Sequence, residues 1–441
     1  MDCVVYPGPG GLEHLETEMR EIKEKKRVTV LGLGETGLES ALFLKRKGYS
    51  VFVSDSQVSE GLERRSGRLM KEKISFELGR HSIEKIGQSD WVLISPGIPP
   101  MAEVCQAIRK KRIPIVSEVE VASWFSTGRV TAVTGTSGKT TVTTLLQRVF
   151  KANGLLSVAC GNIGNPWIGE VDRLTPDTEI VLEISSFQLV HTFSLYPQIA
   201  ILLNIGLNHL DWHAGLEDYI SSKLRLFQHQ TAEDFALLRR QDQEEFFPKF
   251  QFKGQVIYFD GKPGGDANEQ LLDKVAELKG LDPAKTQEVI SRFEGIEHRL
   301  EKVANVGGVE FVNDSKCTTL EALIWALERF PDGKIVLLAG GHAKGADFRL
   351  VRDRISKKLK RGILYGEAQQ LLWKSWEGTA PLVRVTGLPE ALQEAVKVAS
   401  PGDVILLSPA CASFDQFSNY QERGKLFKKL VEEMRLTLAS H

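Results

Sequence analysis

The sequence predicts an α/β protein of three domains, each built on a mostly parallel sheet. Residues 27–46 and 129–152 each read as a strand, a glycine-rich loop and a helix, and a further series of buried-looking strands follows residue 300. Strands that alternate with helices are typical of a parallel sheet covered by helices on both faces. The length of 441 residues agrees with three domains, because a domain averages about 150 residues.

The composition is that of a globular protein and argues against several classes of function. Hydrophobic residues make up 42% of the chain and charged residues 26%, and the formal net charge is -1. A chain this close to neutral does not favour nucleic acid or an anionic membrane as a partner. No apolar run approaches the ~18 residues of a membrane-spanning helix. The five cysteines are scattered and form no C-x-x-C pair, so we expect a reducing cytoplasm and neither a disulfide framework nor a zinc site.

The first domain is expected over residues 1–118, and about the first 25 residues read as a polar extension without a secretory signal. The stretch "RVTVLGLGETGLESALFLKRKGYSVFVSD" then predicts a strand, a glycine turn, a helix and a second strand. Gly32, Gly34 and Gly37, with Asp55 farther on, match a dinucleotide fingerprint on a Rossmann-like fold. A tight turn without a ligand is the alternative. The strand in "SDWVLISPGIPP" leads towards the boundary near residue 118.

The second domain is expected over residues 119–300 and opens with "VTAVTGTSGKTT", residues 130–141. The usual phosphate loop is G-x-x-x-x-G-K-[ST], but here the first glycine is Gly135, so the loop is shorter. Gly135 and Gly138 would let backbone N–H groups surround phosphate oxygens at a helix N-terminus. Lys139 would supply a charge for the phosphates and Thr140 a hydroxyl for Mg²⁺. A chance GKT in an exposed turn is the alternative.

Further polar residues of this domain follow apolar strands. "EIVLEISSFQL", residues 179–189, reads as one strand that carries Glu183, and a carboxylate there is costly unless it meets a cation. In the loop after "LLNI", His209 could ligate a metal or hold a phosphate, whereas a satisfied polar side chain is the better reading for His213. Lys223 lies on the next helix, where a lone lysine ordinarily keeps its charge in water.

The third domain is expected over residues 301–441. Strands are predicted in "VEFVNDSK", "KIVLLAGG", "RGILYG" and "DVILLSPACAS", a helix over 319–330, and a long helix at the end of the chain. Polar and aromatic residues follow these strands, at the edge where ligands bind in open α/β sheets. They are Asp314, Ser315, Lys316, Thr318, Lys344, Ser413, Phe414 and Tyr420. The aromatic members could instead cover the core.

In this order the motifs resemble the Mur ligases of peptidoglycan synthesis. The family's phosphate loop has the short form G-x-x-G-K-[ST], as in "GTSGKT", and "GNIG", "EISSFQL", "NHLDWH", "EHR", "NDSK" and "GGHAKGADF" match further family positions. "SPACASFDQF" favours the member that adds D-glutamate. The resemblance implies a Rossmann-like N-terminal domain, a P-loop mononucleotide-binding central domain and a Rossmann-like C-terminal domain.

The resemblance also implies the reaction, which is ATP-driven amide formation between UDP-N-acetylmuramoyl-L-alanine and D-glutamate. The L-alanine carboxylate would take the γ-phosphate, and the D-glutamate amine would displace it from the acyl phosphate. A carboxylate is a poor electrophile until it is phosphorylated, and two anions meet only where cations screen them. The implied setting is a cytoplasmic monomer with Mg²⁺, two ions in all, that serves cell wall biogenesis and so cell shape and cell division.

Site residues follow from the same resemblance. The catalytic set is Lys139, Glu183, His209, Lys223 and Lys316, of which Lys223 would be carbamylated. The metal ligands would be Thr140, Glu183, His209 and Lys223. ATP would be bound by Gly135, Thr136, Ser137, Gly138, Lys139, Thr140, Thr141, Asn268, Arg299 and Asp314. Glu35, Thr36, Asp55, Ser56 and Gly97 would bind the UDP moiety, Asn162 the substrate or nucleotide, and Thr318, Lys344, Ser413, Phe414 and Tyr420 D-glutamate.

Three alternatives remain at this stage. An NAD-dependent oxidoreductase would account for the first glycine loop but not for "GTSGKTT" or the third domain. A nucleotide-binding regulatory or scaffold protein without catalysis would fit a central domain that looks short. A sibling ligase would carry out the same chemistry with a different amino acid.

Overall fold

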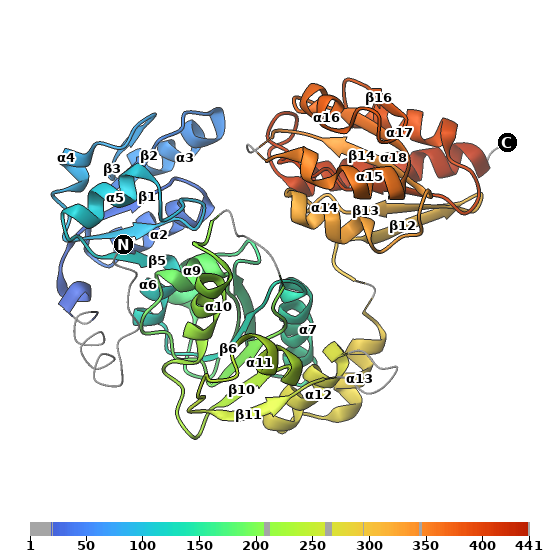
Figure 1. The fold of residues 1–441 in the computed structure, drawn as a ribbon. Coiled ribbons are helices and arrows are strands. Elements are labelled where there is room, and N and C mark those ends of the chain that lie inside the picture. Colours follow the sequence, from blue (N-terminus) through green and yellow to red (C-terminus); the bar gives the residue numbers. More distant parts are fainter. Residues whose placement is uncertain are drawn as a thin grey trace. The chain divides into compact units, whose positions relative to one another are not determined.

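The computed structural model describes residue 19 and residues 21–206, 212–260, 267–293, 295–343 and 346–439 (Figure 1). The expected N-terminal extension, apart from its last few residues, lies outside these ranges, as do His209 and Lys344. The chain divides into two compact units, Met1–Phe293 and Glu294–His441. Among the described residues the first unit holds two sheets and the second holds one.

The first sheet is parallel throughout, in the order β3-β2-β1-β4-β5. Its strands are β1 (Arg27–Leu31), β2 (Ser50–Asp55), β3 (Ser75–Leu78), β4 (Trp91–Ile94) and β5 (Ile115–Ser117), and its helices α2 (Glu35–Arg46), α3 (Glu60–Lys71), α4 (Ile83–Ile86), α5 (Glu103–Lys110) and α6 (Glu118–Phe125). Every residue of β4 is buried, as expected for a strand covered on both faces. The chain reverses its direction along the sheet between β1 and β4, and such a switch opens a crevice at the carboxyl ends of the strands.

The second sheet is also parallel, in the order β11-β10-β9-β6-β8-β7. Its strands are β6 (Arg129–Thr134), β7 (Ser157–Gly161), β8 (Glu179–Glu183), β9 (Ile199–Leu202), β10 (Phe235–Leu238) and β11 (Gln255–Tyr258). The helices are α7 (Lys139–Ala152), α8 (Trp167–Glu170), α9 (Ser186–Val190), α10 (Leu216–Leu224), α11 (Arg240–Phe246), α12 (Ala267–Leu278) and α13 (Pro283–Ser291). Helix α7 packs against α12 and α13, which closes one face of the sheet.

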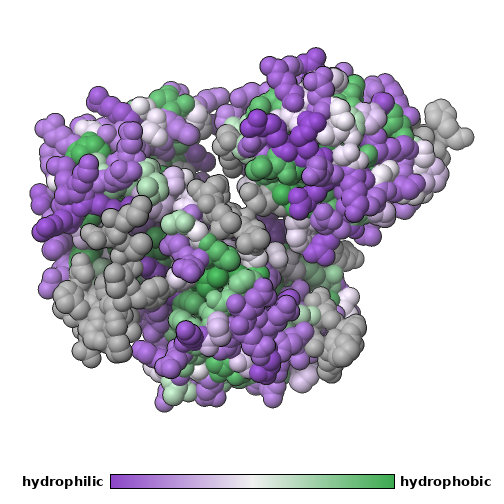
Figure 2. Space-filling model, viewed as in Figure 1, coloured by the Kyte–Doolittle hydropathy of each residue, from purple (hydrophilic) through white to green (hydrophobic). Residues whose placement is uncertain are grey.

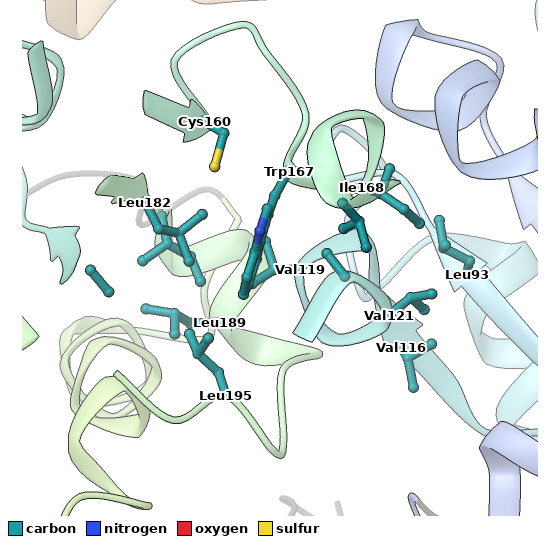
Figure 3. Packing of buried hydrophobic residues seen from close by; sticks show 14 of the residues in the cluster. Leu93, Val116, Val119, Val121, Cys160, Trp167, Ile168, Leu182, Leu189 and Leu195 are labelled. Carbon is teal, nitrogen blue, oxygen red and sulfur yellow. The ribbon is translucent and has the colours of Figure 1, made fainter. Parts of the chain in front are cut away.

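One hydrophobic core joins the two sheets of the first unit. Figure 3 shows the indole of Trp167 between Leu182 of β8 and Val119 of α6, with Leu93 of β4 farther along the same cluster. All four side chains are at most 1% exposed. Because burial of apolar surface is the main stabilising term in folding, this shared core explains why the two sheets form one compact unit.

The single sheet of the second unit has the order β12-β13-β17-β14-β15-β16, and only the β12–β13 pair is antiparallel. Its strands are β12 (Glu301–Val306), β13 (Val309–Asn313), β14 (Ile335–Gly340), β15 (Leu359–Tyr365), β16 (Leu382–Arg384) and β17 (Val404–Leu407). The helices are α14 (Leu320–Leu327), α15 (Arg352–Lys358), α16 (Gln369–Trp376), α17 (Leu388–Val398) and α18 (Tyr420–Ala439). These three mostly parallel sheets confirm the predicted α/β class.

Two sequence-based expectations need correction. The stretch 179–189 is not one strand, because β8 ends at Glu183 and α9 begins at Ser186. Ser185 caps the helix: its side chain accepts from the backbone N–H of Gln188 while the Gln188 side chain accepts from the backbone N–H of Ser185, a reciprocal capping box. The helix expected over 319–330 is shorter and begins at Leu320 after the Thr319 cap.

The surface is mainly hydrophilic, as expected when most apolar side chains are buried in the cores. Figure 2 shows mainly hydrophilic residues on the face seen in Figure 1, with hydrophobic residues in small groups. Within the part of the chain that the structure describes, no helix combines the length and the apolarity that crossing a membrane requires.

Candidate active site

The short glycine loop connects β6 to α7 in the predicted strand–loop–helix order. Gly135 has φ 151° and Gly138 has φ 82°, conformations that residues with a side chain rarely adopt. A Cβ at Gly135 would also lie 2.9 Å from the Cβ of Leu203. Glycine is therefore required at both positions, and the loop presents its backbone at the N-terminus of a 14-residue helix, where anions are favoured.

Asn204, just after β9, holds this loop in place. Its Oδ1 accepts from the backbone N–H groups of Thr136 (3.1 Å) and Ser137 (2.9 Å), and its Nδ2 donates to the carbonyl of Ser137 (3.2 Å). The Thr136 hydroxyl lies 2.8 Å from the hydroxyl of Tyr219 on α10. Asn204 was not among the predicted site residues, although a polar residue shortly after a buried strand was a usable signal.

Two lysines converge on one carbonyl of the loop. The Nζ of Lys139 donates to the carbonyl of Gly135 at 2.8 Å, and the Nζ of Lys223 donates to the same oxygen at 3.0 Å. Lys223 is only 1% exposed, and burial together with the nearby Lys139 holds its pKa well below the usual value. The expectation that Lys223 keeps its charge in water is therefore wrong, because α10 packs against the loop. Lys139 supplies positive charge at the N-terminus of α7, which makes the loop a site for an anion.

Glu183 lies beside the loop at the end of β8. The pairing of Val133 with Glu183 places β8 next to β6, and the residue is 2% exposed. Its Oε1 accepts from the side-chain amide of Asn162 at 2.8 Å. Its Oε2 is buried and has no hydrogen-bond partner among the described residues. A cation beside a buried carboxylate oxygen left in this way would be favourable, and Thr140, 3% exposed in the first turn of α7, offers a second oxygen.

These oxygens fit Mg²⁺ better than a metal that prefers nitrogen or sulfur. No cluster of three or more His, Cys, Asp or Glu side chains suited to a metal occurs in the described ranges. Mg²⁺ is usually held by one or two carboxylates together with phosphate oxygens and water. The predicted ligand His209 lies outside the described residues. His213 has both ring nitrogens bonded, Nδ1 to Asp218 at 2.9 Å and Nε2 to Ser186 at 3.0 Å, as a satisfied side chain would.

A cleft of about 670 Å³ lies at the carboxyl edge of the first sheet. The five residues that the sequence analysis assigned to the UDP moiety all line it: Glu35, Thr36, Asp55, Ser56 and Gly97. The carboxylate of Asp55 accepts from the backbone N–H groups of Leu33 (2.7 Å) and Gln57 (2.9 Å). It therefore anchors the glycine turn as well as facing the cleft.

In the second unit, Asp314 is buried at the end of β13. Its carboxylate accepts from the Ser408 hydroxyl at 2.8 Å and from the backbone N–H of Leu300 at 3.2 Å. Burial raises the pKa of Asp314 to about 7. Burial therefore favours the protonated form of this carboxyl unless a cation approaches it.

Arg423 of α18 ties together three strand ends of the second unit. It is fully buried, and its guanidinium donates to the carbonyls of Ser315 (2.8 Å), Cys411 (3.2 Å) and Gly340 (3.4 Å). The strand ends at β13, β14 and β17 precede the residues predicted to bind D-glutamate. Sequence reasoning missed Arg423 because nothing local distinguishes it from the charged residues of an exposed helix.

The other predicted residues of the second unit differ in exposure. Ser413 is 2% exposed, whereas Phe414 is 67% exposed, so the alternative that Phe414 covers the core is wrong. The Nζ of Lys316 lies 5.9 Å from the ring centre of Tyr420, and the Tyr420 carbonyl accepts from Ser315. Arg299 and Thr318 are half-buried. Asn268 lies in the first unit, at the start of α12, and Lys344 lies outside the described residues.

Comparison with known proteins decides the family. Residues 26–117 match the N-terminal domain described as "Mur ligase MurD-like", residues 133–281 the "Mur ligase middle domain", and residues 298–411 the "Mur ligase, glutamate ligase domain". A protein of Acidobacterium capsulatum is 37% identical over 93% of this chain and 97% of its own length. One of Aquifex aeolicus is 36% identical over 91% of this chain and 98% of its own. Both are named UDP-N-acetylmuramoylalanine–D-glutamate ligase. The chain belongs to the Mur ligase family.

Solved structures agree with the Mur ligase fold. The MurF ligase of Thermotoga maritima in complex with ADP aligns with 94% of this chain and 97% of its own, with a TM-score of 0.53 and 16% identity. A murein peptide ligase from Psychrobacter arcticus covers 91% of this chain and 98% of its own, with a TM-score of 0.51 and 15% identity. The predictions of a Mur ligase and of an ATP-dependent ligase in peptidoglycan synthesis are confirmed. The oxidoreductase alternative is wrong.

Proposed function

We propose that this Mur ligase joins D-glutamate to UDP-N-acetylmuramoyl-L-alanine, with cleavage of ATP to ADP and phosphate. One observation carries the proposal. Relatives named UDP-N-acetylmuramoylalanine–D-glutamate ligase are 36–37% identical to this chain, and each alignment covers more than nine-tenths of this chain and of the relative. The loop geometry supports it, because Lys139 lies on the glycine loop at a helix N-terminus, where a transferred phosphoryl group needs positive charge.

The reaction takes two bond exchanges. An oxygen of the L-alanine carboxylate attacks the γ-phosphorus as the bond to ADP breaks, which forms an acyl phosphate. The neutral amine of D-glutamate then attacks the acyl carbon, phosphate leaves, and the nitrogen loses a proton. Gly135 to Thr141 would bind the ATP phosphates through backbone N–H groups and hydroxyls. Lys139 would stabilise the negative charge on the γ-phosphoryl group during its transfer.

Thr140 and Glu183 would hold Mg²⁺, which when bound supplies positive charge to the phosphate oxygens. The buried and unpartnered Oε2 of Glu183 supports this role. By resemblance, His209 and a carbamylated Lys223 would hold a second ion. Carbamylation joins the lysine nitrogen to the carbon of CO₂ with loss of a proton, which replaces an amine by a carboxylate-like ligand.

The carbamate has a direct test. We expect a ¹³C carbamate signal when the protein is incubated with ¹³C-bicarbonate, and no such signal from Lys223→Met. A wild-type spectrum without the signal at saturating bicarbonate would contradict this role for Lys223.

The remaining assignments complete the proposal. We assign ATP contacts to Asn268, Arg299, Asp314 and Lys316, and contacts with the muramyl nucleotide to Asn162 and the five residues of the N-terminal cleft. D-glutamate is assigned to Thr318, Lys344, Ser413, Phe414 and Tyr420, with Lys344 as the cation for its side-chain carboxylate. The domain limits 1–118, 119–300 and 301–441, a monomeric state and a cytoplasmic location also belong to the proposal.

Phosphate release tests the proposed function. Purified protein with ATP, Mg²⁺ and UDP-N-acetylmuramoyl-L-alanine is offered D-glutamate, L-alanine and a diamino acid side by side. We expect release with D-glutamate only, and none when the muramyl substrate is omitted. Preference for another amino acid would favour a sibling ligase.

A further inference from the structure

A buried polar cluster borders the N-terminal cleft and has no part in the reaction described above. The Ser54 hydroxyl, at the end of β2, lies 2.9 Å from Oε1 of Glu77 and 2.8 Å from Nδ1 of His81. Ser54 is fully buried and Glu77 is 7% exposed, whereas His81 lines the cleft. We propose that His81 reads the base of the nucleotide substrate, its Nε2 accepting a hydrogen bond from N3–H of uracil. The inference rests on the proposed function, which places a UDP moiety in this cleft.

The hydrogen bonds of the cluster determine which ring nitrogen of His81 carries the proton. Ser54 has one proton to donate, and the Glu77 carboxylate, which also faces Arg80 and Lys85 at 3.7 and 3.8 Å, is its strongest acceptor. The Ser54 oxygen must then accept from Nδ1–H of His81. Burial lowers the pKa of His81 and so favours the neutral ring, in which Nε2 carries the lone pair when Nδ1 carries the proton. Because Nδ1 is bound to a buried hydroxyl, Nε2 is the nitrogen left for a ligand.

The order of the strands indicates which end of the substrate lies near His81. The glycine turn after β1 occupies the middle of the sheet edge, where the start of α2 favours the diphosphate. On one side of it, Ser95 and Pro96 after β4 share a small cavity with Gln188 of α9, the helix that follows β8 of the second sheet. The muramyl end must run to that side, because its carboxylate has to meet the phosphate loop. The uridine therefore runs the other way, over β2 towards β3, and His81 follows β3.

Uracil and cytosine differ at the atom that this contact would read. N3 of uracil carries a hydrogen, whereas N3 of cytosine is an acceptor with a lone pair. A neutral imidazole that presents an acceptor can bond to N3–H of uracil but not to N3 of cytosine, so the contact favours uracil by about one hydrogen bond. A ribose hydroxyl could also donate to Nε2, but that contact would not distinguish UDP from CDP.

Two substitutions distinguish the contribution of Nε2 from that of Nδ1. In His81→Asn, the side-chain amide can take over the hydrogen bond between Nδ1 and Ser54, but no atom takes the place of Nε2. In His81→Gln the longer amide can place an oxygen near the position of Nε2. Binding of UDP and of CDP to the intact protein is measured by calorimetry, with thermal unfolding and the KM values for ATP and D-glutamate as controls.

We expect the wild type to bind UDP about tenfold more tightly than CDP, the size of one lost hydrogen bond. His81→Asn should lose this preference with unchanged stability and unchanged KM for ATP, and His81→Gln should recover most of the UDP affinity. Equal weakening of UDP and CDP, or an unchanged preference in His81→Asn, would overturn the inference. Turnover of UDP-N-acetylmuramoyl-L-alanine is followed separately: a wild type that binds UDP selectively but forms no product would refute the proposed function and leave the base contact standing.

Discussion

Replacement of Asn204 by alanine should weaken ATP binding more than any other step. The change removes the acceptor for two loop N–H groups and the donor to one loop carbonyl. A lost partner costs about 1 kcal/mol per group, and water can replace part of this because Asn204 is only half-buried, so we expect about 2 kcal/mol in total. That free energy lowers the ratio of binding-competent to other loop conformations about thirtyfold, which raises the apparent Kd for ATP by up to the same factor.

The assay is the KM for ATP in the phosphate-release reaction, with the other substrates saturating. The KM for the muramyl nucleotide should stay within about twofold of wild type, because its proposed site is the N-terminal cleft. Asn153→Ala is the matched control: Asn153 ends the same helix, α7, donates to Val149 at 2.9 Å and accepts from Asp282 at 2.9 Å. The Asn153→Ala substitution should lower the stability of the protein without changing the KM for ATP. An ATP KM within threefold of wild type in Asn204→Ala, or equal changes in both variants, would refute the reasoning.

Three further substitutions test other parts of the molecule. Lys139→Ala should lower kcat by about 1,000-fold, because the γ-phosphoryl group loses its nearest cation; near-normal phosphate release would contradict this role. Glu118 has its pKa raised by burial from 4.5 to about 7, so the folded state binds more protons than the unfolded state between these values and loses stability as pH rises through them. Glu118→Gln should therefore match the wild type in urea unfolding at pH 4.5 and exceed it by up to ~3 kcal/mol at pH 8; a difference independent of pH would contradict the assignment. Arg423→Met should cost the second unit about 3 kcal/mol, because buried carbonyls lose their donor; a loss below 1 kcal/mol in urea unfolding would show that they find other partners.

Local chemistry predicted much of the fold. The glycine loops and the apolar strands depend on backbone sterics and periodicity, and both of these act over a few residues. The stretch 179–189 shows the limit. A capping box overrode the apolar pattern, and Ser185 with Gln188 was a readable signal for it.

Some residues of the candidate site could likewise be predicted from the local sequence, and others could not. Lys139 and Thr140 follow from the loop sequence, because a helix N-terminus after glycine carries its own anion preference. The assignments that rested on resemblance, such as those of Asn268 and Lys316, stay predictions. Arg423 had no local signal, because its partners are more than 80 residues away in the chain, except for the carbonyl of Cys411.

Lys223 shows what required the tertiary structure. On its own helix it is an ordinary lysine whose charge would stay in water. The packing of α10 against the glycine loop buries the Lys223 side chain. It also brings the Lys223 amine to the carbonyl of Gly135, which Lys139 contacts as well. A strand or a loop forms from neighbours in the chain, whereas burial, an altered pKa and a shared acceptor depend on groups that only the folded chain brings together.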